Sequence, residues 1–288
     1  MFYEKIAVAI SAFALAAGIV DAAHRNWTSE AHEPVHHIFT NTTDRTLDVD
    51  DVNGTVEVIG DTGNTIRVEG EKVMRAADAQ ALDRARREVT LDINEKDGIA
   101  QLYVNGPFRD NGHSSENHGF HTHSDDHDYE VTYNLTIHVP RATELRLRDT
   151  NGEIKTGETN GKFDIRGVNG SLTMTGAAGF GTASTVNGRL SVGFRESPRA
   201  ASEFHSVNGA IDASFPSSLS ADLRFKTLNG QVYTDFDAKA LADSPGSTER
   251  RNGKFVYASN RSSSVRIGSG GPELNFETVN GDIRIHKQ

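Results

Sequence analysis

The chain has 288 residues, which is enough for a large buried core in one or two domains. Its formal net charge of −10, without a local cluster of Lys and Arg, excludes the basic surface that nucleic-acid binding needs. The 27 Gly favour an all-β protein rich in turns, and the absence of Cys excludes disulfides and a lipidated cysteine anchor.

Residues 1–23 differ in character from the rest of the chain. Lys5 precedes an apolar run of about 15 residues, shorter than the roughly 20 that span a bilayer. Val20-Asp21-Ala22 has the small-x-small pattern of a cleavage site, so the segment is predicted to be a signal peptide, with an uncleaved anchor as the alternative. We therefore expect export to the periplasm or cell surface of a bacterium, with membrane contact only through an uncleaved residue 1–23 segment.

The next segment, residues 24–44, is polar and is predicted to be a mobile leader to a β-strand-repeat domain spanning residues 45–288. Alternating apolar residues from Leu47 to Val68 predict strands. The helical period from Lys72 to Glu88 predicts one helix in the N-terminal half, placed to pack on the sheet or to cover an open end of it.

Two more predicted strands, 89–93 and 99–104, lead to a polar insertion at residues 105–128. A long alternating strand follows from Tyr129 to Val139, and Pro140 ends it because proline lacks the backbone donor of a sheet.

Histidines are concentrated in the insertion and make it the one candidate metal site. Imidazole and carboxylate groups suit Zn²⁺, Ni²⁺ or Cu²⁺. The loop has no apolar anchors, however, so the entropy of ordering it opposes specific binding. We expect no resident cofactor, with opportunistic Zn or Ni as the alternative. The candidate ligands are His113, His118, His121, His123 and His127.

The second half of the chain repeats one phrase, an Asn-Gly pair followed by alternating apolar residues. From Asn151 onward the Asn-to-Asn steps are 9, 9, 18, 21 and 21 residues, and a gap of 51 precedes Asn280. A period near 20 is typical of stacked repeats, and it predicts a β-solenoid or rolled parallel β-repeat architecture over residues 145–288. The earliest copy, Asn53-Gly54, lies far upstream.

Each Asn-Gly pair is interpreted as a corner, because both residues enter left-handed backbone conformations at low cost. The alternation that follows places apolar side chains on the inner face of each strand. The corner Asn side chains are predicted to stack as a hydrogen-bonded ladder, and glycan contact is the alternative role. The inner residues are Ile154, Phe163, Ile165, Leu172, Met174, Leu190, Val192, Ile211, Ala213, Ile283 and Ile285.

These features resemble a bacterial family of exported β-strand-repeat proteins known as putative adhesins, whose domain has no assigned function. The resemblance rests on the strand from Val131 to Pro140, on Leu145-Arg146-Leu147, on the Asn151, Asn160 and Asn169 turns, and on the closing Val279 to Ile285. It implies a β-solenoid or rolled sheet, export, and no assigned catalytic residues. The His-rich insertion departs from the family pattern.

No catalytic centre is predicted. The outward positions mix signs and sizes without an acidic cluster, and the sequence has no nucleophile elbow, phosphate loop or His-Glu-x-x-His helix. The sequence therefore predicts a non-enzymatic exported structural or interaction module of the cell envelope, binding a protein or glycan through an extended sheet face. The alternatives are a glycan-active β-helix enzyme and an envelope metal-binding protein that uses the His-rich loop.

Overall fold

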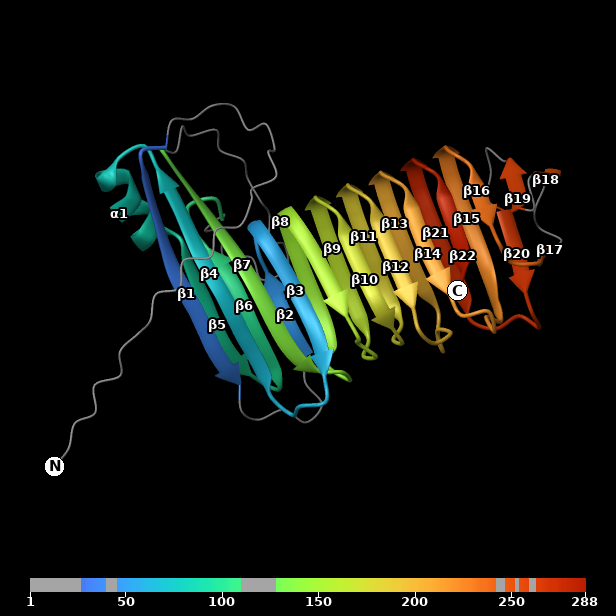
Figure 1. Cartoon of the computed structure of the whole chain (residues 1–288), viewed down its shortest axis with the longest axis horizontal. Coiled ribbons are helices and arrows are strands. Elements are labelled where there is room, and N and C mark those ends of the chain that lie inside the picture. Colours follow the sequence, from blue (N-terminus) through green and yellow to red (C-terminus); the bar gives the residue numbers. More distant parts are fainter. Residues whose placement is uncertain (1–26, 40–45, 110–127, 242–246, 252–253, 259–262) are drawn as a thin grey trace.

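The structure, a computed structural model, describes residues 27–39, 46–109, 128–241, 247–251, 254–258 and 263–288. The chain is an elongated stack of strands with one helix at its N-terminal end (Figure 1). The prediction of an all-β protein with one helix in the N-terminal half is confirmed. The signal segment, most of the His-rich insertion and the Asn252-Gly253 pair lie outside the described residues.

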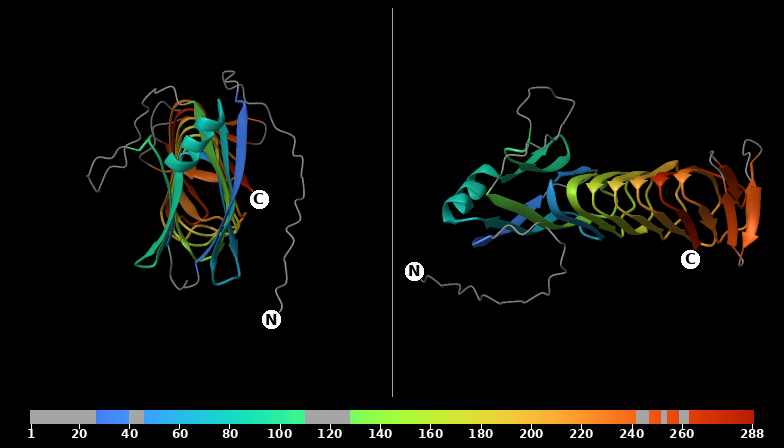
Figure 2. Two further views of the ribbon diagram at one scale, coloured as in Figure 1. Left: turned by 90° about the vertical axis from the view of Figure 1, so that its left-hand side faces the viewer. Right: turned by 90° about the horizontal axis from the view of Figure 1, so that it is seen from above.

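The N-terminal end of the stack is antiparallel. The strands β1 (Ser29–Phe39), β4 (Ile66–Ala76) and β7 (Tyr129–Pro140) pair side by side. A hairpin of β5 (Thr90–Lys96) and β6 (Ile99–Asn105) lies opposite, and the helix α1 (Ala79–Glu88) contacts β4, β7 and β1. This helix covers the end of the molecule, as predicted (Figure 2).

The predicted helix start at Lys72 is wrong, because residues 72–76 belong to β4, which is paired on both sides. The helix begins at Ala79, where the Asp78 carboxylate accepts a hydrogen bond from the backbone N–H of Ala81. Lys72 is buried, and its ammonium donates to the Val89 carbonyl at 2.6 Å, beyond the C-terminal end of the helix.

The prediction that residues 24–44 form a mobile leader is wrong for Ser29–Phe39, which form β1. All 11 residues of this strand pair with β4. Polar outer side chains reinforce the pairing: His32 contacts Glu71 at 3.1 Å, and Arg75 contacts Glu30 at 3.1 Å. This edge strand therefore needs few apolar residues.

The rest of the stack consists of two facing ladders of parallel strands (Figure 2). The first ladder contains, in spatial order, β2 (Thr46–Asp50), the first half of β8 (Glu144–Gly157), β9 (Phe163–Asn169), β11 (Gly181–Asn187), β13 (Ser202–Asn208), β21 (Glu273–Asn280) and β15 (Ala221–Asn229). The second contains β3 (Asn53–Asp61), the second half of β8, β10 (Leu172–Ala177), β12 (Leu190–Phe194), β14 (Ile211–Phe215), β22 (Ile283–Lys287) and β16 (Val232–Thr234).

The core fills the space between the two ladders. All the apolar residues predicted to face inward are buried, so the assigned strand phase is confirmed. At the C-terminal end of the core the Phe276 ring stacks on Phe204 at 5.0 Å and on Phe225 at 5.6 Å between ring centroids. Such rings contribute large buried areas and offset stacking to the core.

The last repeat lies out of chain order. The unit formed by β21 and β22 lies between the β13–β14 unit and the β15–β16 unit, which come earlier in the chain. The strands β17 (Ala238–Ala240), β18 (Ser247–Arg251), β19 (Lys254–Ala258) and β20 (Ser263–Ile267) then add antiparallel pairs at the C-terminal end. The 51-residue gap in the repeat spacing thus contains the end cap and the return of the chain.

The predicted Asn ladder is confirmed. In the order Asn53, Asn151, Asn169, Asn187, Asn208, Asn280 and Asn229, each side-chain amide after the first donates to the side-chain oxygen of the preceding Asn, at 2.7 to 3.1 Å. Asn160 lies nine residues out of phase at the opposite corner, where its backbone N–H donates to Arg141.

The prediction that the corner glycines adopt a left-handed backbone conformation is wrong for most of them. Among the corner glycines that the structure describes, only Gly54 has a positive φ. The others are required because the backbone of the neighbouring unit approaches closely: a Cβ on Gly281 would lie 2.2 Å from the Gly209 carbonyl oxygen. Close approach of stacked backbones, and not a left-handed conformation, therefore selects glycine here.

Candidate binding groove

The outer face of the second ladder carries two rows of side chains that run across the units. One row passes through Lys155, Thr173, Ser191, Asp212, Arg284 and Tyr233, and the other through Gly157, Thr175, Gly193, Ser214 and His286. Strand alternation directs these residues outward because their chain neighbours form the core. The register therefore brings together side chains that are more than 100 residues apart in the sequence.

In the middle of the two rows the side chains are small, and they leave an open groove with a volume of about 360 Å³. Its floor is formed by strands β10 and β12, where Thr173, Ser191 and Gly193 stand in place of long side chains. Met174, Thr175, Gly176, Val192, Asp212, Ser214, His286 and Gln288 complete the lining. A volume of this size lies at the lower end of the range for small-molecule sites.

One end of the groove is charged. The Asp212 carboxylate lies 3.3 Å from Arg189 Nη1 and 3.6 Å from Arg284 Nη1. The His286 ring lies between two carboxylates, with Nε2 3.9 Å from Asp212 Oδ1 and Nδ1 3.2 Å from Asp235 Oδ2. Arg189, Asp212 and Arg284 are among the outward positions of mixed charge in the sequence, and the structure brings them into one cluster.

The groove offers hydrogen-bonding groups of both kinds. The hydroxyls of Thr173 and Ser191 can donate and accept, and the Gln288 amide already donates to Ser214 Oγ at 2.8 Å. The serine nearest the imidazole is thus engaged with an amide, and His286 is engaged with carboxylates. This arrangement can exchange hydrogen bonds with a hydroxyl-bearing ligand.

The sequence reasoning missed Ser191, Gly193 and His286 as groove residues. A detectable signal was present: aligned on Asn-Gly, two successive units have small outward residues, and the units on either side have charged ones. The position of His286 could not be found in this way, because the last unit lies out of chain order.

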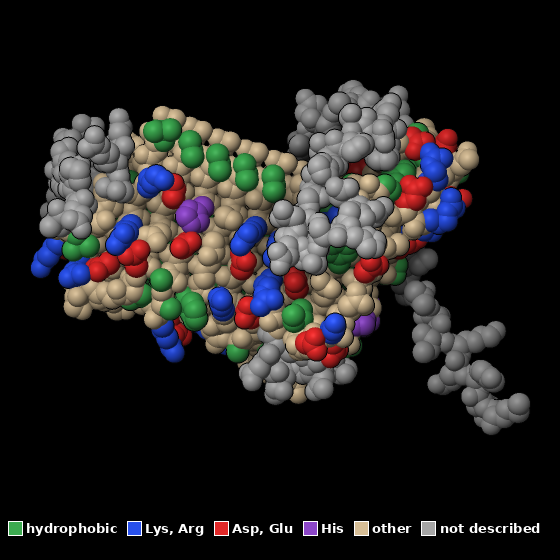
Figure 3. Space-filling model, turned by 180° about the vertical axis from the view of Figure 1, so that it is seen from behind, with side chains coloured by type: hydrophobic (Ala, Val, Ile, Leu, Met, Phe, Trp, Pro, Cys, Tyr) green, Lys and Arg blue, Asp and Glu red, His purple; other side chains and the backbone are tan. Residues whose placement is uncertain are grey.

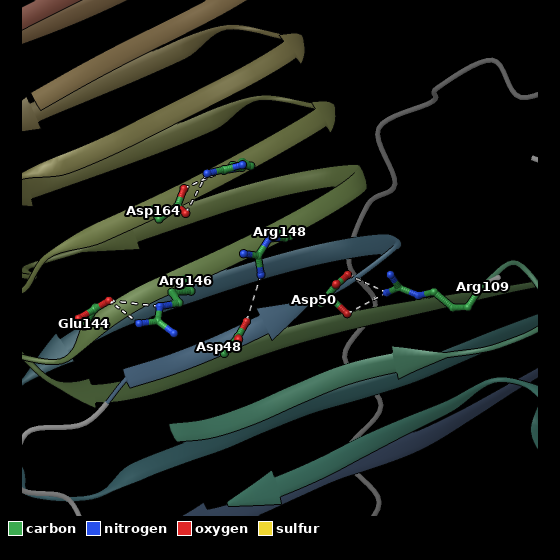
Figure 4. A network of polar contacts seen from close by, with 8 residues as sticks. Asp48, Asp50, Arg109, Glu144, Arg146, Arg148 and Asp164 are labelled. Carbon is green, nitrogen blue, oxygen red and sulfur yellow. Dashed lines mark hydrogen bonds and ion pairs between the residues drawn. The ribbon is translucent and has the colours of Figure 1, made fainter. Parts of the chain in front are cut away.

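The opposite face, on the first ladder, is covered with ion pairs (Figure 4). Arg146 pairs with Glu144 in β8, and Arg166 pairs with Asp164 in β9, so each pair lies within a single strand. Their side chains are about one-third to three-fifths exposed, so each pair contributes little to stability. The pair of Arg109 and Asp50 differs, because these side chains are only 10% and 12% exposed.

Removal of the Arg109 guanidinium is expected to destabilise the N-terminal end. Arg109 donates to Asp50 Oδ1 at 2.7 Å and to the Val104 carbonyl at 3.0 Å, and it lies over the Tyr103 ring. Arg109→Met leaves a buried carboxylate unpaired and is expected to lower the free energy of unfolding by about 3 kcal/mol, measured by urea titration. Arg166→Met, the exposed control, is expected to cost about 0.5 kcal/mol or less. Equal losses would contradict the role assigned to Arg109.

A row of exposed apolar side chains runs along the corner beside the Asn ladder (Figure 3). Val168, Val186 and Val207 are 38–40% exposed and Leu228 is 63% exposed. Each immediately precedes a ladder Asn, and Val279 holds the same position in the inserted unit. The stack therefore carries a hydrophobic edge, in which successive apolar side chains are separated by the strand spacing of about 4.8 Å.

The candidate metal ligands His113, His118, His121, His123 and His127 lie outside the described residues, so Zn or Ni binding there stays a prediction. Across the described ranges, no group of three or more His, Asp or Glu side chains is placed to hold a metal ion. None of the described helices is long and apolar enough to cross a membrane.

Comparison with known proteins finds likeness only at the level of structure. No family model and no curated protein matches the chain. A "putative cell adhesion protein" from Clostridium sporogenes has 12% identity and a TM-score of 0.42, with 89% of this chain and 100% of that chain covered. A "putative adhesin" from Bacteroides fragilis has 11% identity and a TM-score of 0.38, with 89% and 97% covered. Another from Parabacteroides merdae has 8% identity and a TM-score of 0.26, with 91% and 97% covered. These names match the family resemblance, and scores below 0.5 identify neither a ligand nor a partner.

Proposed function

We propose that this protein is a non-enzymatic, exported interaction module of the bacterial cell envelope that binds a short glycan segment in the groove of its second ladder. The observation that carries the proposal is the groove itself: an open trough across two units, floored by hydroxyl and glycine residues and closed at one end by Asp212 and His286. The adhesin-like role agrees with the names of the similar solved structures, but the support for glycan binding comes from the groove itself.

The chemistry of the lining favours a hydroxyl-rich ligand. Sugar hydroxyls act as donor and acceptor at once, and the groove presents Thr173 and Ser191 hydroxyls beside a carboxylate and an imidazole. Because the groove is open to solvent, it can accept a segment of a longer chain. A protein partner is the other candidate, and it would contact the wider rows of charged residues.

We further propose that the stacked units form a β-solenoid, since each unit contributes one strand to each parallel ladder and its corner Asn to one continuous hydrogen-bonded row. Such a stack is rigid along its axis, and repeat proteins use such extended surfaces for binding. Export to the periplasm or cell surface is part of this proposal, as is an opportunistic metal site in the His-rich loop.

The proposal predicts that filling the groove abolishes glycan binding. Ser191→Tyr places a ring over the floor of the groove. Ser184→Tyr makes the same change in the adjoining strand β11 of the same unit, on the opposite face. In a glycan array followed by calorimetry on the best-bound glycan, we expect Ser191→Tyr to weaken binding at least about tenfold, or about 1.4 kcal/mol, and Ser184→Tyr to leave it unchanged.

Three results would overturn the assignment. Binding unaffected by Ser191→Tyr places the glycan elsewhere. Capture of an envelope protein, without glycan binding, favours the protein partner. Cleavage of a bound glycan, detected as new reducing ends, establishes the enzyme alternative. Thermal unfolding of both variants controls for folding.

A further inference from the structure

Beneath the Asn ladder lies a second set of buried side chains, two residues before the corner Asn in every unit except that of Asn169, where this position is Gly167. In four successive units this position is Thr185, Ser206, Thr278 and Thr227, and we refer to these as the hydroxyl row. Each hydroxyl donates to the corner-glycine carbonyl of the neighbouring unit, at 3.0 to 3.2 Å. The row therefore supplies one donor per unit to a carbonyl that the strand pairing leaves free.

At the N-terminal end of the stack the same position is occupied by two carboxyl groups, Asp51 and Asp149. Both side chains are buried, with 1% and 3% of their surface exposed. One oxygen of each accepts a backbone N–H, from Val52 at 2.7 Å and from Asn151 at 3.1 Å. The other oxygen of each, Oδ2, is buried without a hydrogen-bond partner.

The free Asp149 oxygen lies where the hydroxyl row has its donors. A Cβ on Gly152 would lie 1.9 Å from the Gly54 carbonyl oxygen and 2.3 Å from Asp149 Oδ2. In a later unit, a Cβ on Gly209 would lie 1.9 Å from the Gly188 carbonyl oxygen and 3.0 Å from Ser206 Oγ. There the Ser206 hydroxyl donates to the Gly188 carbonyl. Two acceptors that face each other without a proton would repel, whereas a protonated carboxyl there can donate as serine does.

We propose that Asp51 and Asp149 form one proton-binding site: the pair holds one proton, which lies on Asp149, and Asp149 Oδ2–H supplies the missing donor to the Gly54 carbonyl. The site lies where the β2–β3 unit meets β8, so the proton stabilises the joint between the N-terminal end and the repeats. This proton also removes the repulsion between two buried negative charges.

The surroundings of the pair support a bound proton. Burial raises the pKa of Asp149 to about 7, and the nearby Asp50 carboxylate adds to that effect. Burial, and then the charge of Asp149, raises the pKa of Asp51 well above its ordinary value. Arg109 faces Asp51 but donates to Asp50, so it does not satisfy the free oxygens.

The remaining facing groups do not neutralise the pair. Tyr133 of β7 is buried nearby, and its pKa is raised by burial and by the negative charge of Asp51, so it brings no cation. Arg148 of β8 pairs with Asp48 at 3.4 Å. Glu33 of β1 and Asp92 of β5 add negative charge around Tyr133.

The sign of the pH dependence follows from the raised pKa values. A carboxyl that holds its proton more tightly when folded stabilises the fold fully below the unfolded-state pKa, and that stabilisation is lost as pH rises through the folded-state pKa. For Asp149 the loss is therefore expected as pH rises from about 4 to beyond about 7. The carboxylates with lowered pKa, such as Asp222 beside Arg266, act in the opposite sense at acid pH.

The test uses the full chain with ¹³C-labelled Asp carboxyl carbons, followed by NMR from about pH 4 to about pH 9, with urea unfolding over the same range. We expect a carboxyl resonance that titrates far above the ordinary Asp range, and a urea midpoint that falls as pH rises. Asp149→Thr, which places a hydroxyl at this position, is expected to remove the Asp149 titration and to weaken the fall of the urea midpoint with pH, whereas the buried Asp51 keeps a raised pKa. Asp149→Asn, which carries an amide donor, serves if the Thr variant does not fold.

The matched control is Asp164→Thr, the same change at a partly exposed, ion-paired Asp in the next unit. It is expected to keep the raised titration and the pH-dependent midpoint. Normal titration of both Asp51 and Asp149, or an unchanged pH dependence in Asp149→Thr and Asp149→Asn, would overturn the proposal.

Discussion

Leu190→Asp is expected to unfold the protein or to lower its free energy of unfolding by at least about 4 kcal/mol. Leu190 is fully buried, with Leu172 and Ile211 in register on either side. A carboxylate there has neither water nor a cation, so it must bind a proton or separate the two ladders. Urea unfolding at neutral pH, followed by circular dichroism, measures the loss.

Ser191→Asp is the matched control, because it introduces the same side chain one residue later, on the groove face. We expect this variant to lose no more than about 1 kcal/mol. Ile211→Asn, in the next unit, is expected to be as damaging as Leu190→Asp for the same reason. Wild-type stability of Leu190→Asp would show that the strand faces are assigned the wrong way round.

Gly281→Ala is the second large effect, at about 3 kcal/mol, and here a single methyl group is responsible. The new Cβ would lie 2.2 Å from the Gly209 carbonyl oxygen and 2.6 Å from its carbon, which are backbone atoms that no rotamer change can move. The two units must separate, which strains the bond from Ile211 N to the Asp282 carbonyl and the Asn280–Asn208 contact of the ladder. Thermal unfolding by calorimetry measures the effect.

Gly157→Ala provides the comparison, since its nearest neighbour would be Thr175 Oγ1 at an ordinary 3.6 Å. This change is expected to be neutral or slightly stabilising, because alanine restricts the unfolded chain. If the two alanine variants were equally stable, the requirement for glycine at the corner would not come from close backbone approach.

The sequence was informative wherever a single unit determines the structure. Period-two alternation placed Leu172, Leu190 and Ile211 in the core, and the in-phase Asn residues predicted the ladder. The order of the units could not be predicted, because every unit presents the same edge of corner Asn and inward apolar residues. Asn280 thus fits beside Asn208 as well as Asn229 does, and only the chain connections decide between them.

Two other errors arose from local signals that tertiary contacts override. Residues 72–76 have helical periodicity but are held between β1 and β7, and the N-cap at Asp78 fixes the helix start. Strand β1 is too polar to predict as a strand, since it depends on pairing with β4 and on contacts such as Arg86 with Glu33. In the groove, Ser191 and Gly193 are distinguished only by their small size, which becomes visible when the units are aligned on Asn-Gly.

The displaced position of residues 273–287 sets an order of assembly. In the final structure β15 and β16 pair with β21 and β22, which are synthesised after them and lie between them and β13 and β14. The final pairing of β15 and β16 is therefore formed only after residues 273–287 have been synthesised. A chain truncated before residue 273 therefore lacks an internal layer of the stack, between β13–β14 and β15–β16, rather than a dispensable tail.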